Sequence, residues 1–164
     1  MQNSDRILVT GGAGYIGAHT VVELIDTGYQ VTVIDNLERS DYKIIEGIES
    51  ITGKKVDFHK MDCLDGAALD TLFAGNRFST VIHFAAYKSV NESVIKPIEY
   101  YKNNVGSLIT ILEVMKKYHV HDLIFSSSCT VYGQPDQIPV DESAPFKKAE
   151  SPYGSCLLYT SRCV

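Results

Sequence analysis

A glycine-rich turn follows the first apolar run of the chain and has the composition of a dinucleotide-binding loop. The letters TGGAGYIG occupy residues 10–17, directly after the apolar residues 7–9. In such a turn Gly11 allows the sharp bend out of a strand, Gly14 lets the backbone approach a pyrophosphate, and Gly17 lets the next helix pack closely. Unpaired backbone N–H groups and the positive end of the helix dipole then attract the anion without a lysine.

An acidic residue completes this pattern. Asp35 ends the apolar run 30–34, eighteen residues after Gly17. A carboxylate at that place accepts hydrogen bonds from the hydroxyls of the adenosine ribose. We expect NAD rather than NADP, because a 2′-phosphate would face Asp35 with like charge, although Arg39 nearby weakens the exclusion. The alternative is that Asp35 is an ordinary solvated turn residue.

The elements that must position these residues alternate along the chain. Short apolar runs of the kind that form buried strands occur at 7–9, 31–34, 56–59, 81–84 and 123–125. Helical patterns lie between them at 15–27, 41–52, 65–75 and 98–118. In the helical segments we expect Asp65 as an N-cap and Gly28, Gly53 and Gly75 as stops. In the last helix we expect the apolar positions, Val105, Leu108, Ile109, Leu112, Val114 and Met115, to face mostly inward.

This βαβ repetition predicts an α/β fold with a doubly wound parallel sheet of the Rossmann type, in strand order 3-2-1-4-5. Ligands of such sheets bind at the carboxyl ends of the strands. The residues just after each predicted strand are therefore candidates for a site: 35–36, 62–63, 85–88 and 126–130. The length of 164 residues predicts one domain.

Composition argues against several other classes of function. A net charge of -5 gives no electrostatic signature of nucleic-acid or anionic-membrane binding. The beginning of the chain has no apolar signal core and no apolar run reaches bilayer length, so we expect a cytoplasmic protein. We expect the four cysteines to be reduced thiols. The close pair His59 and Cys63 lacks a second pair, which makes a metal site improbable.

Later blocks of the sequence resemble the extended short-chain dehydrogenase/reductase family, and within it the UDP-glucose 4-epimerases. The matching blocks are TGGAGYIG at 10–17, DN at 35–36, HFAAYKSVNESV at 83–94, PIEYYKNN at 97–104, FSSSCTVYGQP at 125–135 and SPYG at 151–154. The resemblance predicts an NAD-binding Rossmann domain over 1–154 and a non-matching tail over 155–164. The chain is shorter than the family's usual length, and the resemblance implies that the substrate domain is missing.

The resemblance implies roles for individual residues. Ser128 and Tyr153 would flank the sugar 4-hydroxyl of a UDP-hexose, with the tyrosinate accepting a proton as hydride leaves for NAD. The hydride would then return to the other face of the keto sugar. The implied cofactor contacts are Tyr15, Ile16, Asp35, Asn36, Asp62, Cys63, Phe84, Ala85, Lys88 and Asn103, in addition to Gly11, Gly14 and Gly17.

One position departs from the family pattern. The lysine expected four residues after Tyr153 is replaced by Leu157. Lysine normally lowers the pKa of the tyrosine, and an unassisted phenol would be ionised in only about one molecule per thousand at pH 7. We therefore expect the chain as written to be inactive. We also expect an exposed edge at the fifth strand and impaired formation of the family's homodimer.

Other interpretations remain open for several of these residues. Ser126, Ser127 and Ser128 could form only a strand-ending turn. Lys88 could be an ordinary solvated lysine, and Asn103 and Asn104 could be merely polar positions on a helix. Ser151 and Pro152 have the signature of a helix start just before Tyr153. A non-catalytic NAD-binding module is a second hypothesis for function. A nucleotide-sugar 4,6-dehydratase is a weaker third, because Cys129 and Thr130 stand where its Asp-Glu pair would be.

Overall fold

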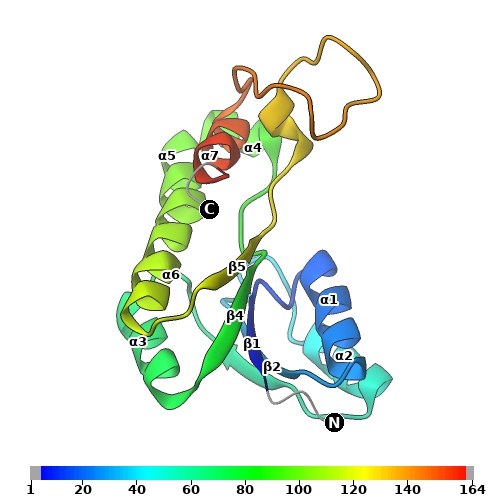
Figure 1. Ribbon diagram of the computed structural model, residues 1–164, viewed down its shortest axis with the longest axis vertical. Coiled ribbons are helices and arrows are strands. Elements are labelled where there is room, and N and C mark those ends of the chain that lie inside the picture. The colour runs from blue at the N-terminus through cyan, green and yellow to red at the C-terminus, as the bar shows by residue number, and fades with distance from the viewer. Residues whose placement is uncertain (1–4, 162–164) are drawn as a thin grey trace. The chain divides into compact units, whose positions relative to one another are not determined.

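The computed structural model describes residues 5–161 (Figure 1). The described chain forms two compact units. The first contains the residues up to 85 together with 109–125, and the second contains 86–108 together with the residues from 126 onward. Arg162, Cys163 and the rest of the predicted tail after Ser161 lie outside the described residues.

A parallel β-sheet forms the centre of the first unit. Its strands are β1 (Arg6–Thr10), β2 (Gln30–Asp35), β3 (Asp57–Lys60), β4 (Phe78–His83) and β5 (Asp122–Phe125). They lie in the order β3-β2-β1-β4-β5, which confirms the predicted topology. Thr10 pairs with Ile34 on one side and with His83 on the other, so the ends of β1, β2 and β4 come level at one edge of the sheet.

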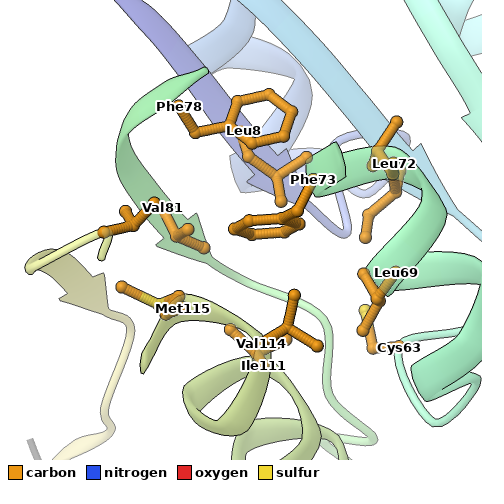
Figure 2. Close-up of a cluster of buried hydrophobic side chains, with 12 residues drawn as sticks. Leu8, Cys63, Leu69, Leu72, Phe73, Phe78, Val81, Ile111, Val114 and Met115 are labelled. Carbon is orange, nitrogen blue, oxygen red and sulfur yellow. The ribbon is translucent and has the colours of Figure 1, made fainter. Parts of the chain in front are cut away.

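Helices cover both faces of this sheet (Figure 1). Helices α1 (Tyr15–Asp26) and α2 (Lys43–Thr52) lie on one face, and α3 (Gly66–Gly75) lies on the other with residues 109–117 of α6 (Gly106–Lys117). Alternation along β1 separates two hydrophobic cores, because Val9 packs toward α1 and α2 while Leu8 packs toward α3. Figure 2 shows the second of these cores, in which Phe73 lies between Leu8 and Met115.

Local capping residues define several helix boundaries. Asp65 caps α3 by accepting a hydrogen bond of 3.0 Å from the Ala68 N–H, as predicted. Gly53 ends α2 with a φ of 66°, also as predicted. Helix α3 ends at Gly75, as predicted, with Asn76 as its C-cap. One predicted stop shifts by a residue, because Thr27 is the C-cap of α1 and Gly28 follows it with a φ of 96°.

The second unit consists mainly of short helices. They are α4 (Val90–Ile95), α5 (Pro97–Tyr100), the π-helix η1 (Tyr101–Val105), the beginning of α6, the 3-10 helix η2 (Cys129–Tyr132) and α7 (Pro152–Thr160). Helix α7 packs against α4, α5, η1 and η2. The most buried side chains of the second unit include Tyr100, Leu108 and Leu157.

The structure corrects one predicted helix. The expected continuous α-helix over 98–118 is interrupted by η1, and the inward-facing positions change after it. Ile109, one of the apolar positions of which most were predicted to face inward, is 47% exposed, whereas Ile111 is fully buried. A π-turn takes up an additional residue, so it rotates the residues that follow relative to a regular α-helix.

Strand β5 lies at one end of the sheet, with β4 as its neighbour. Ile124 in β5 is 56% exposed, which agrees with the expected exposure at this edge. An exposed strand edge offers unpaired backbone groups and an apolar side chain for association. Within the part of the chain that the structure describes, no helix has the length and apolar character needed to cross a bilayer.

Candidate functional site

The glycine turn between β1 and α1 is pressed against the chain that leaves β4. Gly11 has a φ of +68°, and a Cβ atom there would lie 2.7 Å from the Ala85 nitrogen and 2.8 Å from its Cα. The Gly11 N–H donates a hydrogen bond of 2.8 Å to the Ile34 carbonyl at the end of β2. Both the backbone angle and the close approach therefore require glycine at this position.

Two further glycines are required by close packing. A Cβ at Gly17 would lie 2.3 Å from the Gly11 carbonyl oxygen, which explains why helix α1 needs glycine in its first turn. A Cβ at Gly12 would lie 2.5 Å from Cγ1 of Val33 in the neighbouring strand. Gly12 was not among the predicted site residues. Its position beside Gly11 at the strand end was the only signal in the sequence that could have identified it.

Gly14 is less crowded than these glycines, because a Cβ there would make one close backbone contact and no other contact within 4 Å. A Cβ there would meet only the Gly11 carbonyl oxygen, at 3.1 Å. Gly14 is also the N-cap of α1, where no side chain accepts a hydrogen bond and the first turn contains no acidic residue. Asp65, Ser89 and Ser151 perform that capping role in α3, α4 and α7. An uncapped and less crowded helix start fits the phosphates of a dinucleotide.

Tyr15 and Ile16 occupy the exposed side of the same helix start. Their exposed fractions are 76% and 60%. The Tyr15 ring contacts the His19 ring edge to face, with centroids 4.8 Å apart. Both residues lie in the first turn of α1, where backbone N–H groups have no acceptor within the helix, so an anion could be bound there.

Asp35 joins the glycine turn to the loop after β2. Its Oδ2 accepts a hydrogen bond of 3.1 Å from the Ala13 N–H, and its Oδ1 accepts from the Leu37 N–H and from the Ser40 hydroxyl, both at 2.9 Å. A carboxylate offers about four acceptor positions. Three are used here, so Asp35 retains capacity for one ribose hydroxyl while its orientation is fixed by the protein.

The ends of β2 and β3 meet as the parallel sheet predicts. Nδ2 of Asn36 donates to Oδ2 of Asp62 over 3.2 Å, and the other carboxylate oxygen of Asp62 accepts from the Leu64 N–H at 2.8 Å. The side chain of Cys63 points into the core with Leu69 (Figure 2), where burial raises the pKa of the thiol to about 12. A ligand at this edge would therefore meet the backbone of Cys63 rather than its sulfur.

Phe84 and Ala85 follow β4 beside the glycine turn. The Phe84 N–H donates to the Thr10 carbonyl at 3.1 Å, and the Ala85 N–H donates to the Thr10 hydroxyl at 3.4 Å. That hydroxyl also lies 2.7 Å from Nδ1 of His83. Burial lowers the pKa of His83 to about 4, so its ring is neutral at physiological pH. Thr10 and His83 were missed as site-supporting residues because buried polar strand positions have no distinctive spacing.

The remaining predicted residues belong to the second unit. Lys88 is exposed in the loop before α4. Asn103 lies in η1, where its Nδ2 donates to Oδ1 of Asn104 at 2.9 Å. Asn104 is 2% exposed, so this polar position of the helix is buried.

Ser128 is the N-cap of η2, and Tyr153 is the second residue of α7. These two helices pack against each other. The Ser128 hydroxyl accepts a hydrogen bond of 3.3 Å from the Thr130 N–H. Ser151 caps α7 by accepting from the Gly154 N–H at 3.1 Å, with Pro152 in the first turn, as the sequence predicted. The Tyr153 ring packs edge to face on Tyr100, with centroids 6.5 Å apart.

Comparison with known proteins places the chain in a family. Residues 8–164 match the family model described as GDP-mannose 4,6 dehydratase. The chain belongs to this family.

The similar curated proteins are UDP-glucose 4-epimerases, which confirms the resemblance seen in the sequence. The enzyme of Schizosaccharomyces pombe is 51% identical over 162 residues, which are 96% of this chain and 45% of that protein. The enzyme of Dictyostelium discoideum is 49% identical over 155 residues, covering 94% of this chain and 45% of that protein. The chain thus spans just under half the length of these relatives.

Solved structures agree with this assignment. The UDP-glucose 4-epimerase of Bifidobacterium longum, solved in complex with NAD+ and UDP, superposes with a TM-score of 0.94 at 46% identity. The match covers 96% of this chain and 47% of that one. The Rossmann-type fold predicted from the strand pattern is therefore confirmed by relatives as well as by the sheet order.

Leu157 lies one turn after Tyr153 on α7, where related sequences led us to expect lysine. It is 3% exposed, and the neighbouring Cys156 is fully buried, with burial raising the pKa of its thiol to about 11. Residues four apart lie on the same face of a helix. An apolar, buried side chain therefore occupies the position at which the resemblance implies a lysine.

No cluster of His, Cys, Asp or Glu side chains suited to a metal ion occurs among residues 5–161. The division of the chain into two units also divides the predicted site residues into two groups. The first unit contains the glycine turn, Asp35, Asn36, Asp62, Cys63, Phe84 and Ala85. The second unit contains Lys88, Asn103, Ser128 and Tyr153.

Proposed function

We propose that this chain is the N-terminal, NAD-binding part of a UDP-glucose 4-epimerase, with a Rossmann domain over 1–154 followed by a non-matching tail over 155–164. The observation that supports it most is the glycine turn, in which Gly11 and Gly17 are needed for packing while Gly14 is less crowded at an uncapped helix start. The epimerase relatives, which are 51% and 49% identical to this chain in sequence, support the same function.

The residues of the first unit would hold the cofactor. Backbone N–H groups at Tyr15 and Ile16 would bind the pyrophosphate, and Asp35 would accept a hydrogen bond from the adenosine ribose. Asn36, Asp62 and the backbone of Cys63 would form the adenine side, with Phe84 and Ala85 toward the nicotinamide. NAD would supply a hydride acceptor for the sugar C4.

In the second unit Tyr153 and Ser128 would act on the 4-hydroxyl of a UDP-hexose. Tyr153 would accept its proton, and the Ser128 hydroxyl would hydrogen-bond the same oxygen. Lys88 and Asn103 would contact the nicotinamide side of the cofactor. Because Leu157 supplies no positive charge to the phenol, we infer that the chain as written binds NAD without turning over a sugar.

The family model bears the name of a 4,6-dehydratase, so that reaction is the natural alternative. Elimination of water needs an acid and a base next to the sugar. Cys129 and Thr130 follow Ser128 where we expect the dehydratase Asp-Glu pair, and neither is a carboxylic acid. Epimerase ancestry is therefore the better supported proposal, with a non-catalytic NAD-binding module as the alternative for this chain itself.

The cytoplasm is the compartment that we expect for this chain. We further infer that formation of the homodimer is impaired. Ile95 and Ile98, on α4 and α5, are 79% and 77% exposed, so an apolar surface is available for association. The helix that begins at Pro152 leads, however, into the predicted non-matching tail. Sedimentation velocity should show a monomer at micromolar concentration, and a stable dimer would contradict this inference.

Calorimetric titration with NAD tests the cofactor proposal. Replacing Gly14 by valine would fill the less crowded side of the turn and should weaken NAD binding by at least about tenfold. Gly47→Ala is the control, because a Cβ at Gly47 meets nothing within 4 Å. Equal affinity of the Gly14→Val variant and the wild type would contradict the proposal.

The inactivity proposal needs a separate assay. Incubation of the wild-type chain with NAD and UDP-galactose should give no detectable UDP-glucose by chromatography. Formation of UDP-glucose that is abolished by Tyr153→Phe would show that Leu157 does not prevent the reaction and would refute this part of the proposal.

A further inference from the structure

Asn104 holds the backbone of a residue in the loop before α4. Its Nδ2 donates a hydrogen bond of 2.8 Å to the Tyr87 carbonyl oxygen, and its Oδ1 accepts one of 2.8 Å from the Tyr87 N–H. One side-chain amide thus pairs both backbone groups of a residue seventeen positions away in sequence. Asn104 is itself only 2% exposed, and both bonds are at least partly shielded from solvent.

Loss of this pairing would be costly at the loop. Removing the amide would break both of these hydrogen bonds to the Tyr87 backbone in a partly buried place, and the loss of such bonds destabilises the conformation that depends on them. Tyr87 directly precedes Lys88. A fixed Tyr87 backbone therefore determines the direction in which the Lys88 side chain leaves the loop.

The other side of Lys88 is also held. The Ser89 N–H donates to the Tyr100 hydroxyl at 3.0 Å, and that hydroxyl donates to Oε2 of Glu92 at 2.9 Å. Tyr100 is fully buried. The exposed Lys88 thus lies between two residues whose backbones are bonded to buried side chains.

The π-helix explains how Asn103 is included in the same arrangement. Both asparagines lie in η1, and Nδ2 of Asn103 donates to Oδ1 of Asn104 at 2.9 Å. This bond fixes which end of the Asn103 amide faces Asn104, so its carbonyl oxygen points the other way. Single π-turns of this kind occur frequently at functional sites.

We propose that Asn104 is a positioning residue that sets the orientation of Lys88 and Asn103 toward the nicotinamide side of bound NAD. This inference rests on the proposed binding of NAD. Asn104 does not touch the cofactor in this account. It acts through the Tyr87 backbone on Lys88 and through its own amide oxygen on Asn103.

A double-mutant cycle in NAD affinity tests the proposal. Asn104→Leu should weaken NAD binding by about tenfold in the wild-type background and by less than about twofold in a Lys88→Met background. A role in general stability alone would weaken binding equally in both backgrounds, and that result would overturn the proposal. Asn104→Asp retains the acceptor for the Tyr87 N–H but loses the donor to its carbonyl, and it serves if the leucine variant fails to fold.

Ser107→Ala is the matched control. Ser107 is also buried at 2% exposure in the same helical region, but its hydroxyl donates a long hydrogen bond of 3.5 Å to the Asn104 backbone carbonyl and does not contact the Asn104 amide. We expect this variant to show no coupling to Lys88→Met. Coupling as large as that of Asn104 would overturn the specific role of the amide.

Limited trypsin digestion gives a readout that does not depend on NAD. The Lys88–Ser89 bond should be cleaved several times faster in Asn104→Leu than in the wild type, with cleavage after Lys55 in the first unit unchanged. Unchanged cleavage after Lys88 would overturn the proposal. A wild-type chain that binds no NAD would instead refute the proposed function, whereas absence of coupling in a chain that binds NAD would refute only the role of Asn104.

Discussion

Replacement of Gly17 by alanine should destabilise the protein, although alanine is the better helix former. A Cβ at Gly17 would lie 2.3 Å from the Gly11 carbonyl oxygen and 2.8 Å from Cα of Gly12. Both are backbone atoms of the turn, so no flexible side chain can move aside. Overpacking of this kind costs typically about 1–3 kcal/mol.

Helix propensity offsets part of that cost, and a second glycine measures the offset. Gly47 lies in the middle of α2 and a Cβ there meets nothing within 4 Å. Gly47→Ala should therefore raise the free energy of unfolding by about 0.5–1 kcal/mol. Subtracting that gain from the overpacking cost leaves roughly 0–2.5 kcal/mol, so Gly17→Ala should be less stable than the wild type by about 1–2 kcal/mol near the centre of that range.

Urea denaturation followed by circular dichroism measures both variants. The transition midpoint should fall for Gly17→Ala and rise for Gly47→Ala, with the slope of each transition unchanged. In thermal melts the first variant should lose about 2–8 °C. A Gly17→Ala protein that is as stable as Gly47→Ala would refute the close packing of α1 on the glycine turn.

Two other features give predictions of the same kind. His83 is protonated in the unfolded chain below pH 6.5 but in the native protein only below about 4, so stability should fall as pH drops through that window. At pH 5 the loss should reach about 2 kcal/mol relative to pH 8, and His83→Gln should reduce this loss in urea titrations at several pH values. Asp65→Ala removes the N-cap bond to Ala68 and should cost about 1 kcal/mol, whereas Asp65→Asn should cost far less; equal losses in the two variants would count against the capping role.

The sheet order could be predicted because its signals are local and repeated. Each strand is a short apolar run, and β1 alternates so that Val9 and Leu8 enter different cores. Right-handed crossovers then leave few arrangements of parallel strands. The helical region from 90 to 105 was harder, because the π-turn breaks the period on which the prediction depends and rotates Ile109 outward.

The candidate site was predictable where sequence spacing determines geometry and unpredictable where tertiary contacts do. The turn at Gly11, Gly14 and Gly17 follows from its motif. The hydrogen bonds of Asn104 to Tyr87 and of Thr10 to His83 join residues far apart in sequence. No periodicity records such pairs, so only the folded chain reveals them.

Titration calorimetry of the wild-type chain with NAD and with NADP tests the central claim most directly. We expect a single NAD site and binding of NADP at least about tenfold weaker, because the 2′-phosphate would face the Asp35 carboxylate. Asp35→Asn should narrow this difference while retaining an acceptor for the Ala13 N–H. Absence of NAD binding, or equal affinity for the two dinucleotides, would contradict the account.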